Sequence, residues 1–324
     1  MIVPEYWAEA RTQKIINGKQ VTLKRFGWSD SSEADAQTKA QKRVDEAFSK
    51  LESGEKVRKI DHKVPYNGAE GLPIREEIIS RHNDSVITRN SYGALCINTP
   101  DVAFADIDYI SEPNSILLAV SALLILASGT GLALYIQSWS VFFGTLFAAL
   151  LFTTSLARLF HKYIISSKGG QDSLALKPIR EFSDNHPDWH LRVYKTPMGY
   201  RVLVMHKTFS PTDDDTLTFF KSIHSDPLYV KMCKNQQCFR ARVSPKPWRI
   251  GLPRITSGTG VWPIKPERMP ERTQWVAKYE KLSRDYAACA FLEKLGSNTS
   301  NPKTEHIQKL HDEYCQSDKD LPIA

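Results

Sequence analysis

Two uncharged apolar runs stand almost end to end near the middle of the chain, and they constrain its fold more than any other feature. The first extends from Ser115 to Ile136 and the second from Ser138 to Ala157. Each is about 20 residues long, the length that a helix needs to cross the hydrocarbon core of a bilayer. A hydrophobic hairpin buried in a soluble protein is the alternative, but helices of soluble proteins normally carry a polar stripe. The pattern predicts a transmembrane helical hairpin over residues 114–163.

The residues around this hairpin predict its topology. Two spans return both flanks to one side, and basic residues follow the second span: Arg158, His161, Lys162 and Lys168. Because basic segments stay in the cytoplasm, we expect a multi-pass protein of the inner (cytoplasmic) membrane, with the lipid bilayer as a partner and the soluble domains in the cytoplasm. Three small-x-x-x-small spacings favour close helix packing: Ala127 with Gly131, Gly129 with Ala133, and Gly144 with Ala148.

Residues 1–90 have the pattern of a small α+β unit. Asn17-Gly18 separates two strand-like runs, a strong signal for a β-hairpin. A helix is expected next, with Ser32 as its N-cap and Gly54 as its stop signal. The segment "GLPIREEIISRH" is then interpreted as a second helix, with Pro73 in its first turn.

The region from Asp101 to Pro245 predicts the central soluble domain. Strand-like "DVAFADIDY" precedes the apolar hairpin, and a helix, two strands, a second helix and the strand "CFRARVS" follow it. This β-α-β-β-α-β order is that of a ferredoxin-like antiparallel sheet, split by the hairpin into residues 91–113 and 170–250. In such a sheet the first and last strands are neighbours. Residues 251–324 are expected to form a Pro-rich extended segment and C-terminal helices, which makes the whole chain α+β.

Asp106 and Asp108 are the candidate catalytic and metal-binding residues. Side chains alternate along a strand, so both carboxylates point to the same face. Oxygen ligands of this kind suit a hard divalent cation, Mg²⁺ or Mn²⁺. The alternative is a solvated strand end whose acidic residues terminate strand pairing.

The last strand adds candidate phosphate-binding residues. Arg240 and Arg242 alternate with apolar residues, and Lys246 and Arg249 lie just beyond them. Guanidinium groups match phosphate oxygens, although a salt-bridge ladder between the two neighbouring strands is an equal alternative. On the third strand, Arg201 and His206 have opposite parity, so only one of them can reach this site.

Two resemblances extend these interpretations. The segments "VPYNGAEGLPIREEI", "YGALCINTPDVAFADIDY" and "CFRARVSPKPWR" resemble a family of bacterial two-span membrane proteins, from which no activity is implied. More remotely, D-x-D in the first strand followed by a G-Y-R turn resembles the catalytic core of archaeo-eukaryotic-type primases. That resemblance implies metal ligands at Asp106 and Asp108 and a nucleotide contact at Arg201, where those enzymes have a histidine. Asp226 is a candidate third acid.

Charge and cysteine content exclude little. Forty-three basic against 36 acidic side chains give a net charge of +7, which favours a cytoplasmic face near anionic lipid or a nucleotide or nucleic-acid partner. The five cysteines follow no zinc-site spacing and are expected to be reduced thiols: Cys96, Cys233, Cys238, Cys289 and Cys315. We therefore expect a membrane-anchored protein with a Mg-dependent nucleotide or phosphate-ligand site, for nucleotidyl or phosphoryl transfer. A non-catalytic membrane-tethered interaction or sensing module is the alternative.

Overall fold

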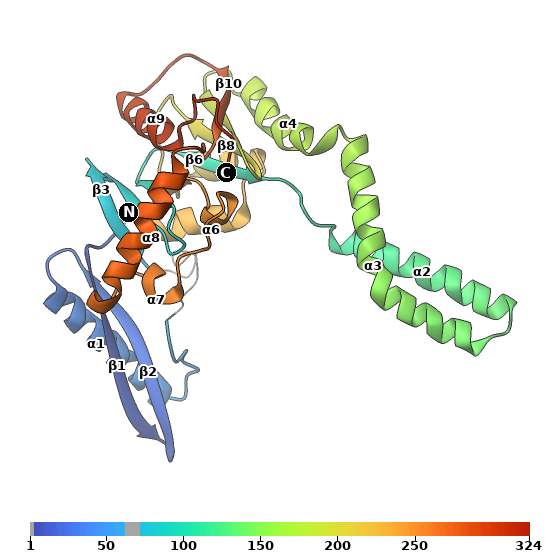
Figure 1. The fold of residues 1–324 in the computed structure, drawn as a ribbon, viewed down its shortest axis with the longest axis horizontal. Coiled ribbons are helices and arrows are strands. Elements are labelled where there is room, and N and C mark those ends of the chain that lie inside the picture. Colours follow the sequence, from blue (N-terminus) through green and yellow to red (C-terminus); the bar gives the residue numbers. More distant parts are fainter. Residues whose placement is uncertain (1–2, 62–71) are drawn as a thin grey trace. The chain divides into compact units, whose positions relative to one another are not determined.

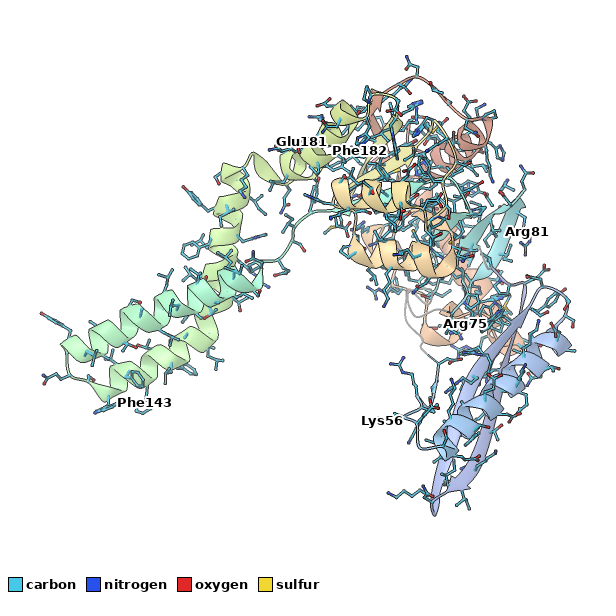
Figure 2. All side chains as sticks on the ribbon, turned by 180° about the vertical axis from the view of Figure 1, so that it is seen from behind. Lys56, Arg75, Arg81, Phe143, Glu181 and Phe182 are labelled. Atoms are coloured by element: carbon cyan, nitrogen blue, oxygen red, sulfur yellow. The ribbon has the colours of Figure 1, made fainter. Side chains whose placement is uncertain are left out.

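The computed structural model describes residues 3–61 and 72–324, and it divides into two compact units (Figure 1). Residues 1–106 and 182–324 form the first unit, and residues 107–181 form the second. The chain leaves the first unit within strand β6 (Phe104–Asp108) and returns within helix α4 (Gly170–Asn185). Figure 2 labels Glu181 and Phe182, where α4 passes from one unit to the other. The structure is thus a mixed α/β protein with antiparallel sheets and two long apolar helices.

The N-terminal hairpin and the following helix form as the sequence predicts. Strands β1 (Tyr6–Ile16) and β2 (Lys19–Ser29) pair across Asn17 and Gly18, which have φ values of 49° and 73°. Such positive values suit a tight hairpin turn. Helix α1 (Glu33–Glu52) covers one face of this hairpin, and its N-cap Ser32 accepts the Asp35 amide hydrogen bond at 3.1 Å. Their core comprises Ala10, Leu23, Ala40, Val44, Ala47 and Phe48.

The helix predicted over "GLPIREEIISRH" is wrong within the described residues. Residues 77–82 form strand β3 (Glu77–His82), which pairs with β4 (Ser85–Arg89) across a turn where Asn83 has a φ of 56°. Two β-branched runs on either side of His82-Asn83-Asp84 form a hairpin, and pairing with β4 outweighs the helix-start signal of Pro73. The start of the predicted helix, Gly71, lies outside the described residues.

The predicted single ferredoxin-like sheet is also wrong in its strand pairing. One four-stranded sheet has the order β10 (Ala290–Gly296), β7 (His190–Thr196), β8 (Gly199–Val204) and β6. The other has the order β3, β4, β5 (Leu95–Thr99) and β9 (Phe239–Arg242). Strand β9 therefore pairs with β5, in the register Ile97 to Ala241, and not with β6. The partial order β7-β8-β6 does agree with the predicted pattern.

Helices and irregular segments complete the first unit. Helix α5 (Asp214–Ser222) forms where it was predicted, and α6 (Pro227–Gln236) follows it. The Pro-rich segment contains the short helices η2 (Pro247–Arg249), α7 (Ser257–Gly260) and η3 (Pro266–Arg268). The C-terminal helices α8 (Met269–Ser283) and α9 (Pro302–Cys315) were both expected, whereas β10 between them was not.

The second unit contains two apolar helices long enough to span a membrane. Helix α2 (Ser115–Tyr135) has 21 residues and α3 (Trp139–Ser167) has 29, about 31 and 43 Å at 1.5 Å per residue. Large apolar side chains on both helices are exposed, including Leu134 (74 %) and Leu150 (79 %), which a soluble core would bury. Figure 2 shows Phe143 on this outer surface.

Of the three predicted small-residue spacings, the one containing Gly129 lies between α2 and α3. A Cβ atom at Gly129 would lie 2.2 Å from the Thr145 hydroxyl oxygen, and Ala133 is buried. Gly131 and Gly144 have open space around the same position, so they do not mediate this packing. At the base of the hairpin, Tyr109 donates a hydrogen bond to Asp172.

Candidate functional site

A cavity of about 280 Å³ in the first unit is lined by four of the charged residues that the sequence analysis singled out, Asp106, Arg240, Arg242 and Lys246. It is lined from β6, α6, β9, the segments before β3 and after β4, and the segment after β9. Its lining includes five cationic residues, Arg75, Arg240, Arg242, Lys246 and Arg254, and two acidic ones, Glu76 and Asp106. The five positive and two negative charges leave a net charge of +3 around a small enclosed volume. Such a surface favours an anionic ligand.

Among the lining residues, Arg75 most strongly indicates that this cavity binds an anion. It is 4 % exposed, and its guanidinium carbon lies 3.6 Å from the centre of the Phe26 ring. Among residues 3–61 and 72–324, no group accepts a hydrogen bond from any of its three guanidinium nitrogens. Burial lowers its pKa to about 10, while Asp61 and Glu9 oppose this shift, so the side chain stays charged at neutral pH. Figure 2 shows Arg75 near the β1–β2 hairpin.

Arg240, predicted to bind phosphate, is instead held by an acidic residue. Its Nη2 donates to both carboxylate oxygens of Glu76 at 2.7 Å, and Nη1 donates to the side-chain oxygen of Asn98 at 3.2 Å. Glu76 also accepts a 2.6 Å hydrogen bond from the Thr88 hydroxyl. These hydrogen bonds offset the free-energy cost of burying both charges. Arg240 therefore stabilises the fold and adds positive potential to the cavity, but its guanidinium is already bound by Glu76 and Asn98. Glu76, which lies within the segment predicted to be a helix, is thus part of the site.

The buried Arg201 and the partly exposed Asp106 form a second ion pair, beside the cavity. The Arg201 Nε donates to Asp106 Oδ1 at 2.8 Å, and its Nη1 donates to the Arg242 carbonyl at 2.7 Å. Arg201 is 3 % exposed, so it supports Asp106 from behind and is not a free phosphate ligand. Arg201 reaches Asp106 from β8, whereas His206 lies beyond the end of that strand, so strand parity does not decide its position. The ring of His206 packs against Trp189.

The two strands that the sequence analysis placed side by side are joined through side chains instead of backbone hydrogen bonds. The Tyr229 hydroxyl donates to the Phe104 carbonyl at 2.9 Å and accepts from the Arg240 amide at 3.4 Å. Burial raises the pKa of Tyr229 well above its usual value, which keeps this hydroxyl a donor. The hydroxyl of Tyr229 and the guanidinium of Arg201 therefore bridge β6 and β9. Asp106 and Arg242 both line the same cavity as a result.

Asp106 and Asp108 have different surroundings. Both oxygens of Asp106 accept hydrogen bonds from Arg201, which neutralises this carboxylate, whereas Asp108 is exposed. A divalent cation at Asp106 would have to compete with these two hydrogen bonds from Arg201. Asp226, the candidate third acid, caps α6 by accepting from the Leu228 and Tyr229 amides.

The remaining predicted phosphate ligands differ in position. Arg242 and Lys246 line the cavity, and Arg242 donates to the carbonyls of Ser244 and Ala324. Arg249 lies outside the lining that the described residues provide. Sequence reasoning missed Arg75, Arg254 and the aromatic pair Tyr92–Trp248, whose ring centres are 5.3 Å apart. No local pattern marks them, because four separate chain segments bring them together.

Three buried side chains outside the cavity also converge, contrary to the scattered thiols that the sequence indicated. Potential ligand atoms of Cys289, His311 and Cys315 lie within 4.8 Å of one another. The His311-x-x-x-Cys315 spacing on α9 is the signal that sequence reasoning passed over, since residues four apart share a helix face.

Comparison of the chain with protein families, with curated proteins and with solved structures found no match.

Proposed function

We propose that the first unit binds a phosphorylated small molecule in the 280 Å³ cavity, with Arg75 as the principal phosphate ligand. The observation that carries this proposal is the buried guanidinium of Arg75, which lacks a hydrogen-bond acceptor among the described residues. A buried charge without a partner costs free energy, and a planar guanidinium is suited to a phosphate. A bound phosphate would supply the missing hydrogen-bond acceptors.

The other cavity residues favour a compact ligand such as a nucleotide held by its phosphates. The volume lies just below the range of about 300–1,000 Å³ typical of small-molecule sites, so a large cofactor would not be enclosed. Trp248 is 40 % exposed and has Arg254 above its ring at 4.3 Å, beside Tyr92. A flat base stacks favourably on such aromatic faces. Lys246 and Arg242 line the same cavity and add positive charge to it.

The protein would act at a membrane surface. Helices α2 and α3 are long and apolar enough to span a bilayer, and Arg158, His161, Lys162 and Lys168 follow the apolar part of α3. We infer an inner-membrane hairpin with both flanks in the cytoplasm. A cytoplasmic reporter should be active at either terminus, and a periplasmic reporter should be active only at the link between α2 and α3. A terminus located outside the cytoplasm would contradict this topology.

Two alternative functions can be tested in the same way. Mg²⁺- or Mn²⁺-dependent nucleotidyl or phosphoryl transfer at Asp106 and Asp108 is the catalytic version. The hydrogen bonds that Arg201 donates to Asp106 argue against this catalytic function, so we favour phosphate binding without a metal. In the second version, a non-catalytic tethered module, the same cations would bind a protein or lipid head groups.

The test is calorimetric titration of the detergent-solubilised full chain with ATP, inorganic pyrophosphate and inorganic phosphate, each with and without Mg²⁺. We expect binding without Mg²⁺, and we expect Arg75→Met to weaken it about 10- to 150-fold, since a hydrogen bond to a charged group contributes about 1.5–3 kcal/mol. Arg81→Met is the matched control, because Arg81 is exposed on β3 (Figure 2).

The free energy of unfolding distinguishes a variant that has lost a ligand contact from a variant that no longer folds. Because Arg75 has no acceptor among the described residues, Arg75→Met should leave the free energy of unfolding unchanged or raise it. Absence of binding by the wild type for all three probes would overturn the proposal. Binding that requires Mg²⁺ and disappears in Asp108→Asn would favour the catalytic version instead.

A further inference from the structure

Three soft metal-binding groups lie together on the far side of Arg201 from Asp106. Cys289 precedes β10, and His311 and Cys315 are on α9. All three residues are completely buried, at 0 % exposure. The Arg201 Nη1 atom lies 3.4 Å from His311 Nε2, so the group adjoins the cavity without lining it.

Long-range backbone hydrogen bonds hold the three residues in place. His311 and Cys315 are four residues apart on α9 and therefore face the same way. The Ala288 amide donates to the Cys315 carbonyl at 2.9 Å, which fixes the neighbouring Cys289 against the end of α9. The arrangement is therefore built into the packing of α9, independently of any ion.

The histidine is oriented as in metal sites. Its Nδ1 lies 2.9 Å from Asp312 Oδ1, so Nδ1–H donates to this carboxylate and Nε2 faces the two sulfur atoms. Asp312 is itself held by Arg192, whose Nη2 donates to Oδ2 at 3.0 Å. A carboxylate behind the histidine fixes its tautomer and raises its basicity, which is the usual outer shell of a zinc-bound histidine.

The distances agree with a single bound ion. His311 Nε2 is 3.5 Å from the Cys315 sulfur and 3.9 Å from the Cys289 sulfur. Metal–sulfur bonds of about 2.3 Å and metal–nitrogen bonds of about 2.0–2.1 Å at a tetrahedral angle place sulfur and nitrogen about 3.6 Å apart. An ion at the centre therefore needs only small side-chain movements.

We propose that Cys289, His311 and Cys315 bind one thiophilic metal ion, either Zn²⁺ or Cu⁺. Thiolate and imidazole ligands select these ions over Mg²⁺ or Ca²⁺. Two thiolates neutralise Zn²⁺, whose fourth position would take a water molecule, and three soft ligands complete a trigonal Cu⁺ site. The ion would tie α9 to the segment before β10, behind the arginine that holds Asp106. Its role is structural, and it does not depend on phosphate binding.

The proposal is tested on the reduced, chelator-treated full chain under anaerobic conditions. Zn²⁺ and Cu⁺ are titrated in separate experiments against a coloured competing chelator, and Co²⁺ is added as a spectroscopic probe. We expect one equivalent of Zn²⁺ or Cu⁺ to bind, and Co²⁺ to show thiolate-to-metal charge-transfer absorption.

Variants locate the site. Cys289→Ser and Cys315→Ser should each weaken binding at least 100-fold and remove the Co²⁺ absorption, whereas Cys96→Ser, at a buried thiol elsewhere, should bind as the wild type does. Asp312→Asn keeps all three ligands and should weaken binding about 10- to 100-fold, which remains informative if a cysteine variant does not fold. The proposal is overturned if the reduced wild type binds neither ion, or if folded Cys289→Ser binds as the wild type does.

Discussion

The guanidinium of Arg201 binds both carboxylate oxygens of Asp106, with Nε to Oδ1 at 2.8 Å and Nη2 to Oδ2 at 3.3 Å. This ion pair changes the interpretation of the D-x-D sequence at Asp106 and Asp108. A motif typical of metal binding here contains one carboxylate that holds a buried arginine and one that is exposed. The following predictions depend on this and other long-range contacts.

Asp106 and Asp108 should differ strongly when each is replaced by asparagine. Asp106→Asn leaves the 3 %-exposed Arg201 without its anion, and because the Asp106 side chain is itself 33 % exposed we expect a loss of about 1–3 kcal/mol in the free energy of unfolding. The exposed Asp108 should tolerate Asn within about 0.5 kcal/mol. Chemical denaturation followed by tryptophan fluorescence measures both. Equal effects of the two variants would mean that the Arg201 pair does not carry the difference.

The Tyr229 hydroxyl should be required for the junction between β6 and β9. Tyr229→Phe removes a donor to the Phe104 carbonyl and an acceptor of the Arg240 amide, leaving buried polar groups without partners. We expect a loss of about 1–3 kcal/mol of stability, measured by the same unfolding experiment. Tyr135→Phe, at a tyrosine that is 87 % exposed, serves as the control and should change little. An unaltered Tyr229→Phe protein would show that this bridge is dispensable.

Two glycines of α2 should respond in opposite ways to alanine. Gly129→Ala places a Cβ atom 2.2 Å from the Thr145 Oγ1, and overpacking of this kind costs about 1–3 kcal/mol. Gly131 has open space at the same position, so Gly131→Ala should be neutral or stabilise α2 by up to about 1 kcal/mol through helix propensity. The thermal midpoint of the detergent-solubilised protein should therefore fall for the first variant only. A fall of similar size for both would argue against close contact at Gly129.

His206 should make stability depend on pH below neutrality. Burial against Trp189 and Phe209 lowers its pKa from 6.5 to about 4, with Lys207 adding to the shift, and its Nδ1 accepts the His190 amide hydrogen bond. Between pH 6.5 and 4 the unfolded chain binds a proton that the folded protein refuses, so stability falls as the pH falls through this window.

The size of this effect is about 1–2 kcal/mol, after discounting for partial solvent exposure. His206→Gln should flatten the pH dependence of the free energy of unfolding between pH 6.5 and 4. His306→Gln, at an exposed histidine, should leave it as in the wild type. If the two variants have the same slope as the wild type, His206 does not titrate as described.

The elements with strong local signals could be predicted from the sequence. Asn17-Gly18 specified the first hairpin, Ser32 specified the start of α1, and apolar length specified α2 and α3. Each depends on residues close together in the chain, where turn chemistry, capping and the absence of charge act without a distant partner. The site was predicted in part for the same reason, because the alternation in β9 placed Arg240 and Arg242 on one face.

Only the tertiary structure decided which partner each of these elements takes. Backbone hydrogen-bonding groups are alike in every strand, so the sequence of β9 alone does not show that it pairs with β5. Nor does it show that β9 is joined to β6 through the side chains of Tyr229 and Arg201. For the same reason, the convergence of Cys289 with α9 and the burial of Arg75 against Phe26 have no local signature. The sequence by itself determined the elements that have strong local signals, among them the first hairpin, α1 and the two apolar helices. The cavity and the thiol–histidine group arise from contacts between distant segments, whose free energy depends on the packing of the whole unit.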